Sequence, residues 1–231
     1  NNFPEILNVK EPVKEERVGL PPLEGAEQGK VVTRFTPAPN GYPHIGHAKA
    51  AIISEEYAKM YDGKIVLRYD DTNPEDTRKE YYAAIKVGLD WLGIEFYEEE
   101  EKHTSDDIEL LYDKCMEMIK KNHVYVCTCK QDTISKNRKE MISCECSMGD
   151  VEQNEDRWGK MLSKYKPGDA IVRFRGDMES KNTVMRDPVL FRINNASHPL
   201  LAEKYRVWPS YDFAVAVLDS TDGITHALRS K

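Results

Sequence analysis

The alternation of strand-like and helix-like runs that begins near Lys30 constrains the fold more than any other feature of this sequence. Residues 31–35 and 65–69 are short apolar runs rich in β-branched and aromatic side chains, which predicts two strands. Each run is followed by a longer segment, 48–61 and 74–92, in which apolar side chains recur at helical spacing. Strand, helix, strand and helix in this order predict an α/β fold with a doubly wound parallel sheet.

Capping residues set the expected ends of the next elements. Asn73 is placed to cap the second helix, with Pro74 in its first position, and Gly93 is placed to end it. Ser105 is expected to start a third helix before a strand at residues 124–126, which would extend the parallel sheet. The inward-facing side chains of that third helix are predicted to be Ile108, Leu111, Tyr112, Cys115, Met118 and Ile119.

The sequence changes character at Cys127. A polar, cysteine-bearing stretch leads to two strand-like runs at 170–175 and 189–193, which indicates an inserted α+β unit. Apolar strand-and-helix character returns at 205–218. The predicted organisation is therefore a leader at 1–29, the first half of the α/β domain at 30–126, an insertion at 127–204 and the start of the second half at 205–231.

Composition narrows the class of protein. The 231 residues, of which 40% are hydrophobic, suffice for one large domain or for one domain with a sizeable insertion. A formal net charge of −7 argues against a protein held on nucleic acid by bulk positive charge, so any RNA contact is expected to be local. Neither a bilayer-spanning apolar run nor a signal segment is present in the sequence, so we expect a cytoplasmic location without membrane association.

The tetrapeptide His44-Ile45-Gly46-His47 lies between the first predicted strand and the first predicted helix. Free backbone N–H groups and the helix dipole favour anions there, which predicts a site for nucleotide phosphates. Gly46 lets the backbone approach a ligand closely, and the two imidazoles can donate hydrogen bonds to phosphate oxygens. Taken alone, the motif favours ordinary loop histidines over a catalytic role, because four residues of this kind often occur by chance.

Longer motifs carry a family resemblance. Residues 34–50, RFTPAPNGYPHIGHAKA, resemble the matching segment of the glutamyl- and glutaminyl-tRNA synthetases, which are class I aminoacyl-tRNA synthetases. Further matches in the same order are the stretches LRYDDTNPE at 67–75, RDPVLFR at 186–192, WPSYDFA at 208–214 and GITHALR at 223–229. The residues of these motifs are similar to those of the archaeal and eukaryotic branch of these synthetases.

The resemblance implies an ATP-dependent ligase with a Rossmann-like nucleotide-binding domain and an insertion that receives the acceptor end of tRNA. Such enzymes join L-glutamate to ATP as an enzyme-bound adenylate and then transfer the acyl group to the 3′ end of tRNA(Glu). By the same resemblance, His44 and His47 are the catalytic residues, and Pro37 and Gly46 join them around the nucleotide. Mg²⁺ is expected to accompany ATP, held mainly by phosphate oxygens.

The resemblance also assigns a pocket for the amino acid. Arg34 and Arg229 match positions near the substrate carboxylates, Asp70 matches an acidic position facing the ammonium group, and Tyr211 matches a pocket-wall hydroxyl. Glutamate needs such partners because it offers one cation and two anions. The alternatives are a surface ion pair for Arg34 and a helix cap for Asp70.

Four cysteines in two close pairs are candidate metal ligands. Cys127 and Cys129 are separated from Cys144 and Cys146 by a spacing that can place four thiolates around one structural Zn²⁺, although unligated thiols are the alternative. The fifth, Cys115, lies on the apolar face of a predicted helix and is interpreted as a buried thiol. Basic side chains follow the first pair, and the resemblance implies tRNA phosphate contact for some of them: Lys130, Lys136, Arg138 and Lys139.

Three other functions stay open: a glutaminyl-tRNA synthetase, a tRNA-modifying paralogue that activates glutamate, and a non-enzymatic zinc-containing RNA-binding module. Arg229 favours the glutamyl enzyme, because glutaminyl enzymes tend to carry cysteine there and an amide would leave the guanidinium partly unpaired. The long insertion disfavours the paralogue, and the binding module leaves the histidine motif unexplained. Because the family's lysine-rich ATP loop and anticodon-binding region do not occur in these residues, we expect a fragment that does not charge tRNA on its own.

Overall fold

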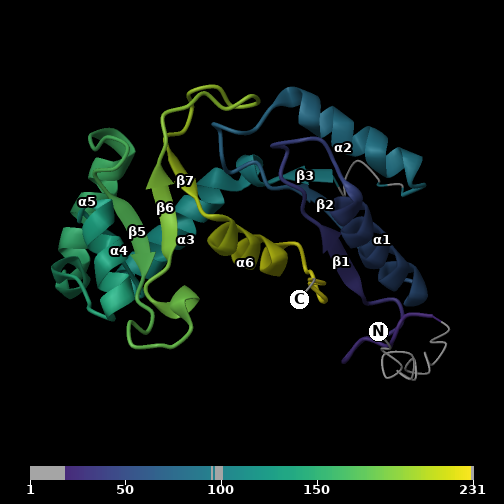
Figure 1. Ribbon diagram of the computed structural model, residues 1–231, viewed down its shortest axis with the longest axis horizontal. Coiled ribbons are helices and arrows are strands. Elements are labelled where there is room, and N and C mark those ends of the chain that lie inside the picture. The colour runs from purple at the N-terminus through teal and green to yellow at the C-terminus, as the bar shows by residue number, and fades with distance from the viewer. Residues whose placement is uncertain (1–18, 95, 97–100, 230–231) are drawn as a thin grey trace, which may run out of the picture.

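The computed structural model describes residues 19–94, 96 and 101–229, which form two β-sheets joined by helices (Figure 1). One sheet has three strands and the other has four. The sheets lie in opposite halves of an elongated molecule, with α6 (Tyr211–Thr221) between them (Figure 1). Of the predicted leader, residues 1–18 lie outside the described part, and residues 19–29 form neither helix nor strand.

The first sheet is parallel, as the sequence predicts. Its strands, in spatial order, are β1 (Val32–Phe35), β2 (Lys64–Tyr69) and β3 (Glu101–His103). Helices α1 (Ile45–Met60) and α2 (Lys79–Trp91) pack on one face of it. The apolar core under these helices consists of Phe35, Ala51, Ala58, Ile65, Leu67, Tyr69, Ile85, Leu89 and Ile94.

The opposite face of the parallel sheet is cationic and meets α6. Successive side chains of a strand point to opposite faces, so β1 buries Phe35 against the α1 side and turns Arg34 toward α6. The Arg34 Nε lies 2.6 Å from Asp219 Oδ1, and the Lys102 Nζ lies 2.5 Å from Asp222 Oδ1. Because helices cover both faces, the predicted doubly wound α/β architecture is confirmed.

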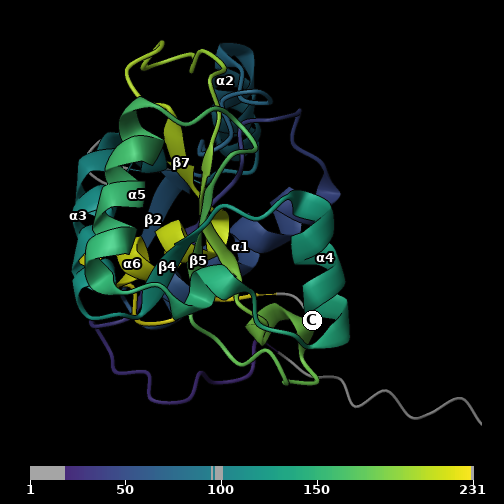
Figure 2. The ribbon, with the colours of Figure 1, turned by 90° about the vertical axis from the view of Figure 1, so that its left-hand side faces the viewer.

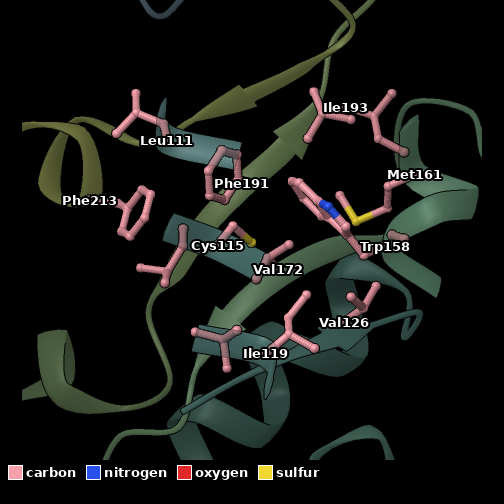
Figure 3. Close-up of a cluster of buried hydrophobic side chains, with 14 of the residues drawn as sticks. Leu111, Cys115, Ile119, Val126, Trp158, Met161, Val172, Phe191, Ile193 and Phe213 are labelled. Atoms are coloured by element: carbon pink, nitrogen blue, oxygen red, sulfur yellow. The ribbon is translucent and has the colours of Figure 1, made fainter. Parts of the chain in front are cut away.

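The second sheet is antiparallel and holds the larger core. Its strands, in spatial and chain order, are β4 (Val124–Cys127), β5 (Ile171–Phe174), β6 (Val189–Ile193) and β7 (Val207–Pro209). One face packs against α6, α3 (Ile108–Lys120) and α5 (Val151–Ser163). Figure 3 shows this core, in which Trp158 and Phe191 meet edge to face with ring centroids 5.3 Å apart.

The other face of the antiparallel sheet carries the cysteines. Alternation along β4 puts Val124 and Val126 into the main core and Tyr125 and Cys127 on the far side. There α4 (Gln131–Glu140) packs through its buried Ile134. Figure 2 shows α4 on the side of the sheet opposite α3 and α5. Two short 3₁₀ turns complete this layer, Glu145–Met148 and Thr183–Met185.

The strand predicted at 124–126 belongs to the antiparallel sheet, so its predicted place in the parallel sheet is wrong. It pairs antiparallel with β5, and the third parallel strand is β3. An apolar run fits either sheet, and here the run packs with α3 and α5 in the core of the antiparallel sheet. At the other end of the insertion, β7 pairs with β6, although it lies beyond residue 204.

Two predicted helix starts are also wrong, because tertiary hydrogen bonds replace local caps. α2 begins at Lys79 instead of Pro74: Arg78 is extended, and its amide donates to the Pro39 carbonyl at 3.0 Å. Ser105 does not cap α3 but lies in a preceding 3₁₀ turn, Thr104–Asp107. Its amide and hydroxyl both donate to the Asp71 carboxylate, at 2.8 and 2.7 Å.

Candidate active site

A cavity of about 370 Å³ opens at the carboxyl end of β1, between α1 and the start of α6. Ligands of open α/β sheets bind at this end of the strands. The motif residues that the sequence singled out meet here from three separate segments. The walls of this cavity, called the β1 cavity below, include Arg34, Thr36, Pro37, His47, Tyr211 and Arg229.

Arg34 supplies a buried donor to the β1 cavity. The residue is 5% exposed; its Nε donates to Asp219 at 2.6 Å, and its Nη1 donates to the Thr36 hydroxyl at 3.3 Å. The remaining nitrogen, Nη2, is buried and has no hydrogen-bond partner in the described structure. A buried N–H without an acceptor is costly, so Nη2 is a candidate donor to a ligand oxygen such as that of a carboxylate.

Arg229 and Tyr211 form the opposite wall. The exposed Arg229 guanidinium lies over the Tyr211 ring, 5.6 Å from its centroid, in cation–π geometry. Tyr211 is the first residue of α6, and Ser210 caps that helix by accepting from the Phe213 amide at 3.4 Å. A second cavity of about 470 Å³, bordered by Lys49, adjoins the β1 cavity at Arg229.

The two histidines cap the N-terminus of α1 through reciprocal hydrogen bonds. His44 Nδ1 accepts from the Gly46 amide at 3.0 Å, and His47 Nδ1 accepts from the His44 amide at 3.2 Å. Since Nδ1 is an acceptor in both neutral rings, the proton of each ring is on Nε2. Burial, reinforced by His44, lowers the pKa of His47. The pair therefore offers two N–H donors at the N-terminus of α1, where the helix dipole also favours an anion.

Gly46 is required by this arrangement. A Cβ at position 46 would lie 2.8 Å from the Cε1 atom of His44. With that carbon present, the His44 imidazole would have to shift from its position over the Gly46 amide. Gly46 also borders the second cavity, so the backbone of α1 is open to a ligand there.

Asp70 does not line the β1 cavity, unlike Arg34, Tyr211 and Arg229, the other residues predicted to bind the amino acid. Its amide donates to the Pro37 carbonyl at 2.9 Å, and its Oδ1 accepts from the Thr72 hydroxyl at 2.9 Å. Burial, with a smaller contribution from Asp71, raises the pKa of its carboxyl group. The alternative role of helix cap is also not seen, since the next helix is capped at Arg78.

Sequence reasoning missed the wall that α1 contributes beyond the histidines. Ala50 and Ser54 line the β1 cavity together with His47. These three positions share one helix face, so counting the helical period forward from His47 would have found them. The Ser54 carbonyl also accepts from the buried Thr33 hydroxyl at 2.8 Å, which fixes α1 against β1.

The four paired cysteines converge on the far side of the antiparallel sheet. Their sulfur atoms all lie within 4.8 Å of one another. Cys127 and Cys144 are 3.8 Å apart, and so are Cys129 and Cys146. Each is a free thiol, as is Cys115, which is fully buried in the main core, where burial raises its thiol pKa.

Comparison with known proteins decides the family. Residues 30–231 match the family described as tRNA synthetases class I (E and Q), catalytic domain. This chain belongs to that synthetase family. The match covers almost all of the described residues, and the family resemblance drawn from the motifs is confirmed.

The synthetase domain has archaeal relatives of high identity. It is 64% identical over 229 residues to the glutamate–tRNA ligase of Nitrosopumilus maritimus, which covers 99% of this chain and 40% of that protein. The corresponding ligase of Cenarchaeum symbiosum is 63% identical over 218 residues, covering 94% and 38%. The chain thus spans about two fifths of the length of these relatives.

A solved structure of a more distant relative shares the fold. The glutamate tRNA ligase of Elizabethkingia meningosepticum, crystallised in complex with its amino acid, superposes with a TM-score of 0.59 at 21% identity. The superposition covers 86% of the synthetase domain and 43% of that chain. Within the described residues, the search for helices that are long and apolar enough to cross a membrane found none.

Proposed function

We propose that this domain forms the glutamate- and nucleotide-binding part of a glutamate–tRNA ligase. The observation that carries the proposal is the β1 cavity, which is lined by His47 and by two arginines, Arg229 and Arg34, the latter with its Nη2 buried and unpartnered. Two guanidinium groups in one small cavity suit a ligand with two carboxylates. The names of the archaeal relatives support the same amino acid.

The proposed reaction needs no side-chain nucleophile. A carboxylate oxygen of L-glutamate attacks the α-phosphorus of ATP and pyrophosphate leaves. A hydroxyl of the terminal ribose of tRNA(Glu) then takes the acyl group, and AMP leaves. His44 and His47 would donate hydrogen bonds to oxygens that gain charge in the first step. The wall residues named for the β1 cavity include no carboxylate, which fits Mg²⁺ entering on ATP phosphate oxygens.

Asp70 is assigned the glutamate ammonium group in this proposal. Its backbone amide is bonded to the carbonyl of Pro37, a wall residue of the β1 cavity, so its backbone lies next to the site. Moving its carboxyl group into contact would require Asp70 Oδ1 to exchange Thr72 for the ligand. Pro37 and Gly46 are assigned to the nucleotide, because each belongs to a backbone segment that borders one of the two adjoining cavities.

Contact with the acceptor end of tRNA is assigned to the antiparallel half. Lys130, Lys136 and Lys139 are exposed on or beside α4 and are available to phosphate groups. Arg138 is less available, because its Nη2 donates to the Thr183 carbonyl at 2.8 Å. An intracellular site of action, the cytoplasm, follows from this role.

The choice of glutamate over glutamine is assigned to Arg229. A guanidinium binds a carboxylate through two charge-assisted hydrogen bonds, whereas an amide offers one acceptor oxygen and leaves a donor unpaired. We expect the full-length protein to prefer glutamate by roughly 10² to 10³ in kcat/KM. Arg229→Leu should remove most of this preference, and Arg229→Lys, which keeps the charge but loses the fork, should retain part of it.

ATP–pyrophosphate exchange with tRNA present measures this preference for both amino acids. Equal glutamate-to-glutamine ratios in wild type and Arg229→Leu would contradict the role of Arg229. Exchange driven by glutamine but not by glutamate would contradict the proposed function itself.

We propose further that Cys127, Cys129, Cys144 and Cys146 hold one structural Zn²⁺. A tetrahedral zinc site with Zn–S bonds of about 2.3 Å has sulfur atoms about 3.8 Å apart, which agrees with the 3.8 Å separations of both facing pairs. The buried Arg173 places its Nη1 3.8 Å from Cys144 Sγ, so a positive charge balances an anionic thiolate cluster. The ion would fix the loop that leads into and out of α4.

Metal analysis of protein purified without added zinc or chelator tests this site. We expect about one zinc per chain, little in Cys144→Ser, and the wild-type amount in Cys115→Ser, the matched control outside the cluster. Zinc-free wild-type protein with four freely reacting thiols under native conditions would refute the proposal.

A further inference from the structure

We propose that Asp219 is the positioning residue of the amino-acid site: it holds the Arg34 guanidinium so that Nη2 faces the ligand. The inference rests on the proposed function for the ligand's identity, but the contact that carries it does not. Asp219 lies outside every motif that the sequence analysis used.

The geometry gives Arg34 one free direction. Asp219 binds Nε at 2.6 Å and Thr36 binds Nη1 at 3.3 Å, so two of three nitrogens are held from two sides. Nη2 is left buried and unpartnered. A planar guanidinium fixed at two nitrogens has its third nitrogen fixed as well. Thr36 is neutral and more distant, so the carboxylate of Asp219 is the stronger of the two restraints.

Helix energetics argue that Asp219 is kept for a tertiary reason. It lies in the last turn of α6, where the helix dipole disfavours negative charge. Asp222 follows at the C-cap and is equally unfavourable there. Cations on the strands, buried or partly buried, compensate both carboxylates. Asp219 pairs with Arg34. Asp222 instead pairs with Arg68 and Lys102.

Variants at these two carboxylates can therefore distinguish a positioning role from a stabilising role. Asp222 joins α6 to β2 and β3 and has a side chain that is only 4% exposed. Asp219 joins α6 to β1 alone, with a side chain that is 20% exposed. A merely structural role predicts that loss of Asp222 is the more damaging change in every assay. A positioning role predicts that loss of Asp219 specifically weakens glutamate binding.

α6 connects this contact to the rest of the site. Its first residue, Tyr211, forms one wall of the β1 cavity, and Asp219 lies about two turns further along. One rigid helix thus sets both the tyrosine wall and the direction of Arg34. A ligand carboxylate displaced by about 1 Å can lose on the order of 10² in rate, so this coupling matters for the reaction.

The test compares Asp219→Asn with Asp222→Asn in the full-length protein. Asparagine keeps the shape but removes the charge, which frees the guanidinium to rotate. For Asp219→Asn we expect the KM for glutamate to rise about 10- to 100-fold, with the KM for ATP within about threefold of wild type. For Asp222→Asn we expect a lower urea midpoint and a glutamate KM within about threefold of wild type. Parallel changes in both variants, or an unchanged glutamate KM in Asp219→Asn, would overturn the inference.

A second readout is independent of activity. In ¹H–¹⁵N spectra the Arg34 Nε–H signal, assigned by its loss in Arg34→Lys, should be protected from exchange with water in wild type and in Asp222→Asn, and unprotected in Asp219→Asn. If wild type activates an amino acid other than glutamate while this pattern holds, the proposed substrate fails and the positioning role stands. If the signal is equally protected in Asp219→Asn, the positioning role fails whatever the substrate.

Discussion

Backbone amides occupy Nδ1 of both motif histidines, which fixes where their remaining protons point. His44 receives the Gly46 amide and His47 receives the His44 amide, so the donor of each ring is on the opposite nitrogen. The lowered pKa of His47 keeps that ring neutral at pH 7. Under the proposed function, neutral imidazoles would donate hydrogen bonds without presenting a full charge to the ground-state phosphate, so we expect their effect to be concentrated in the transition state.

This arrangement predicts a kinetic split. Replacing His44 and His47 together by alanine in the full-length protein should lower the rate constant of adenylate formation at least about 10²-fold. The KM for glutamate should change by less than about threefold, because Arg34 and Arg229 are untouched. Single-turnover kinetics separate the two effects, with the exposed His123→Ala as the control. A change confined to KM would show that the pair binds substrate without stabilising charge.

Single residues were predictable from the sequence where a motif marks a chemical role. Arg34, His47, Tyr211 and Arg229 do line one cavity. Asp219 was not predictable, because its partner is 185 residues away and its position on α6 resembles that of an ordinary solvated carboxylate. The position of Asp70 outside the cavity was not predictable either, because it depends on a backbone hydrogen bond between Asp70 and the loop at Pro37.

At the scale of elements, the sequence predicted the type of most helices and strands but not all of their ends and partners. Hydrophobic periodicity is local, and it identified α1, β2 and β6 correctly. The start of α2 depends on the Arg78 amide reaching the Pro39 carbonyl at 3.0 Å, which no local cap signal reports. Likewise, alternation along β4 shows that it has two buried faces but is silent on which sheet supplies its neighbour.

At the scale of the whole molecule, the two sheets are joined by buried polar contacts as well as by α6. His198, in the loop between β6 and β7, is 1% exposed and stacks on Trp208. Its Nε2 lies 3.0 Å from the carbonyl of Asp71, which follows β2 in the other sheet. Its Nδ1 accepts from the Leu200 and Leu201 amides, both at 3.3 Å, so the ring is neutral.

This contact predicts a pH dependence of stability. Burial lowers the pKa of His198 from 6.5, an effect partly opposed by Asp71 and Asp106 and reinforced by His103. A histidine whose pKa is lower in the folded state contributes stability above its unfolded pKa and loses it as the pH falls. The stabilisation should therefore be complete above about pH 6.5 and should decline below it.

Urea unfolding at pH 7.5 and 5.5 checks the sign. His198→Asn should be less stable than wild type by about 2 kcal/mol or more at pH 7.5, through lost stacking and hydrogen bonding. The difference in the free energy of unfolding between wild type and His198→Asn should be smaller at pH 5.5, since only wild type then carries the cost of a buried protonated ring. The exposed His123→Asn serves as control. A gap that widens as the pH falls would mean that the charged form of His198 is favoured by the fold.

Two contacts of β1 with residues 219–225 have a consequence for synthesis on the ribosome. The Val32 amide donates to the Thr225 hydroxyl at 2.8 Å, and Arg34 can pair with Asp219 only after Asp219 has been synthesised. At translation speeds of about 5–20 residues per second, the 185 residues that separate Arg34 from Asp219 take roughly 10–40 s to emerge. During that interval the first strand is made but its cationic face is uncovered. The nascent domain should consequently favour the early, local folding of α1 on β1 and β2, and form the Arg34–Asp219 contact later.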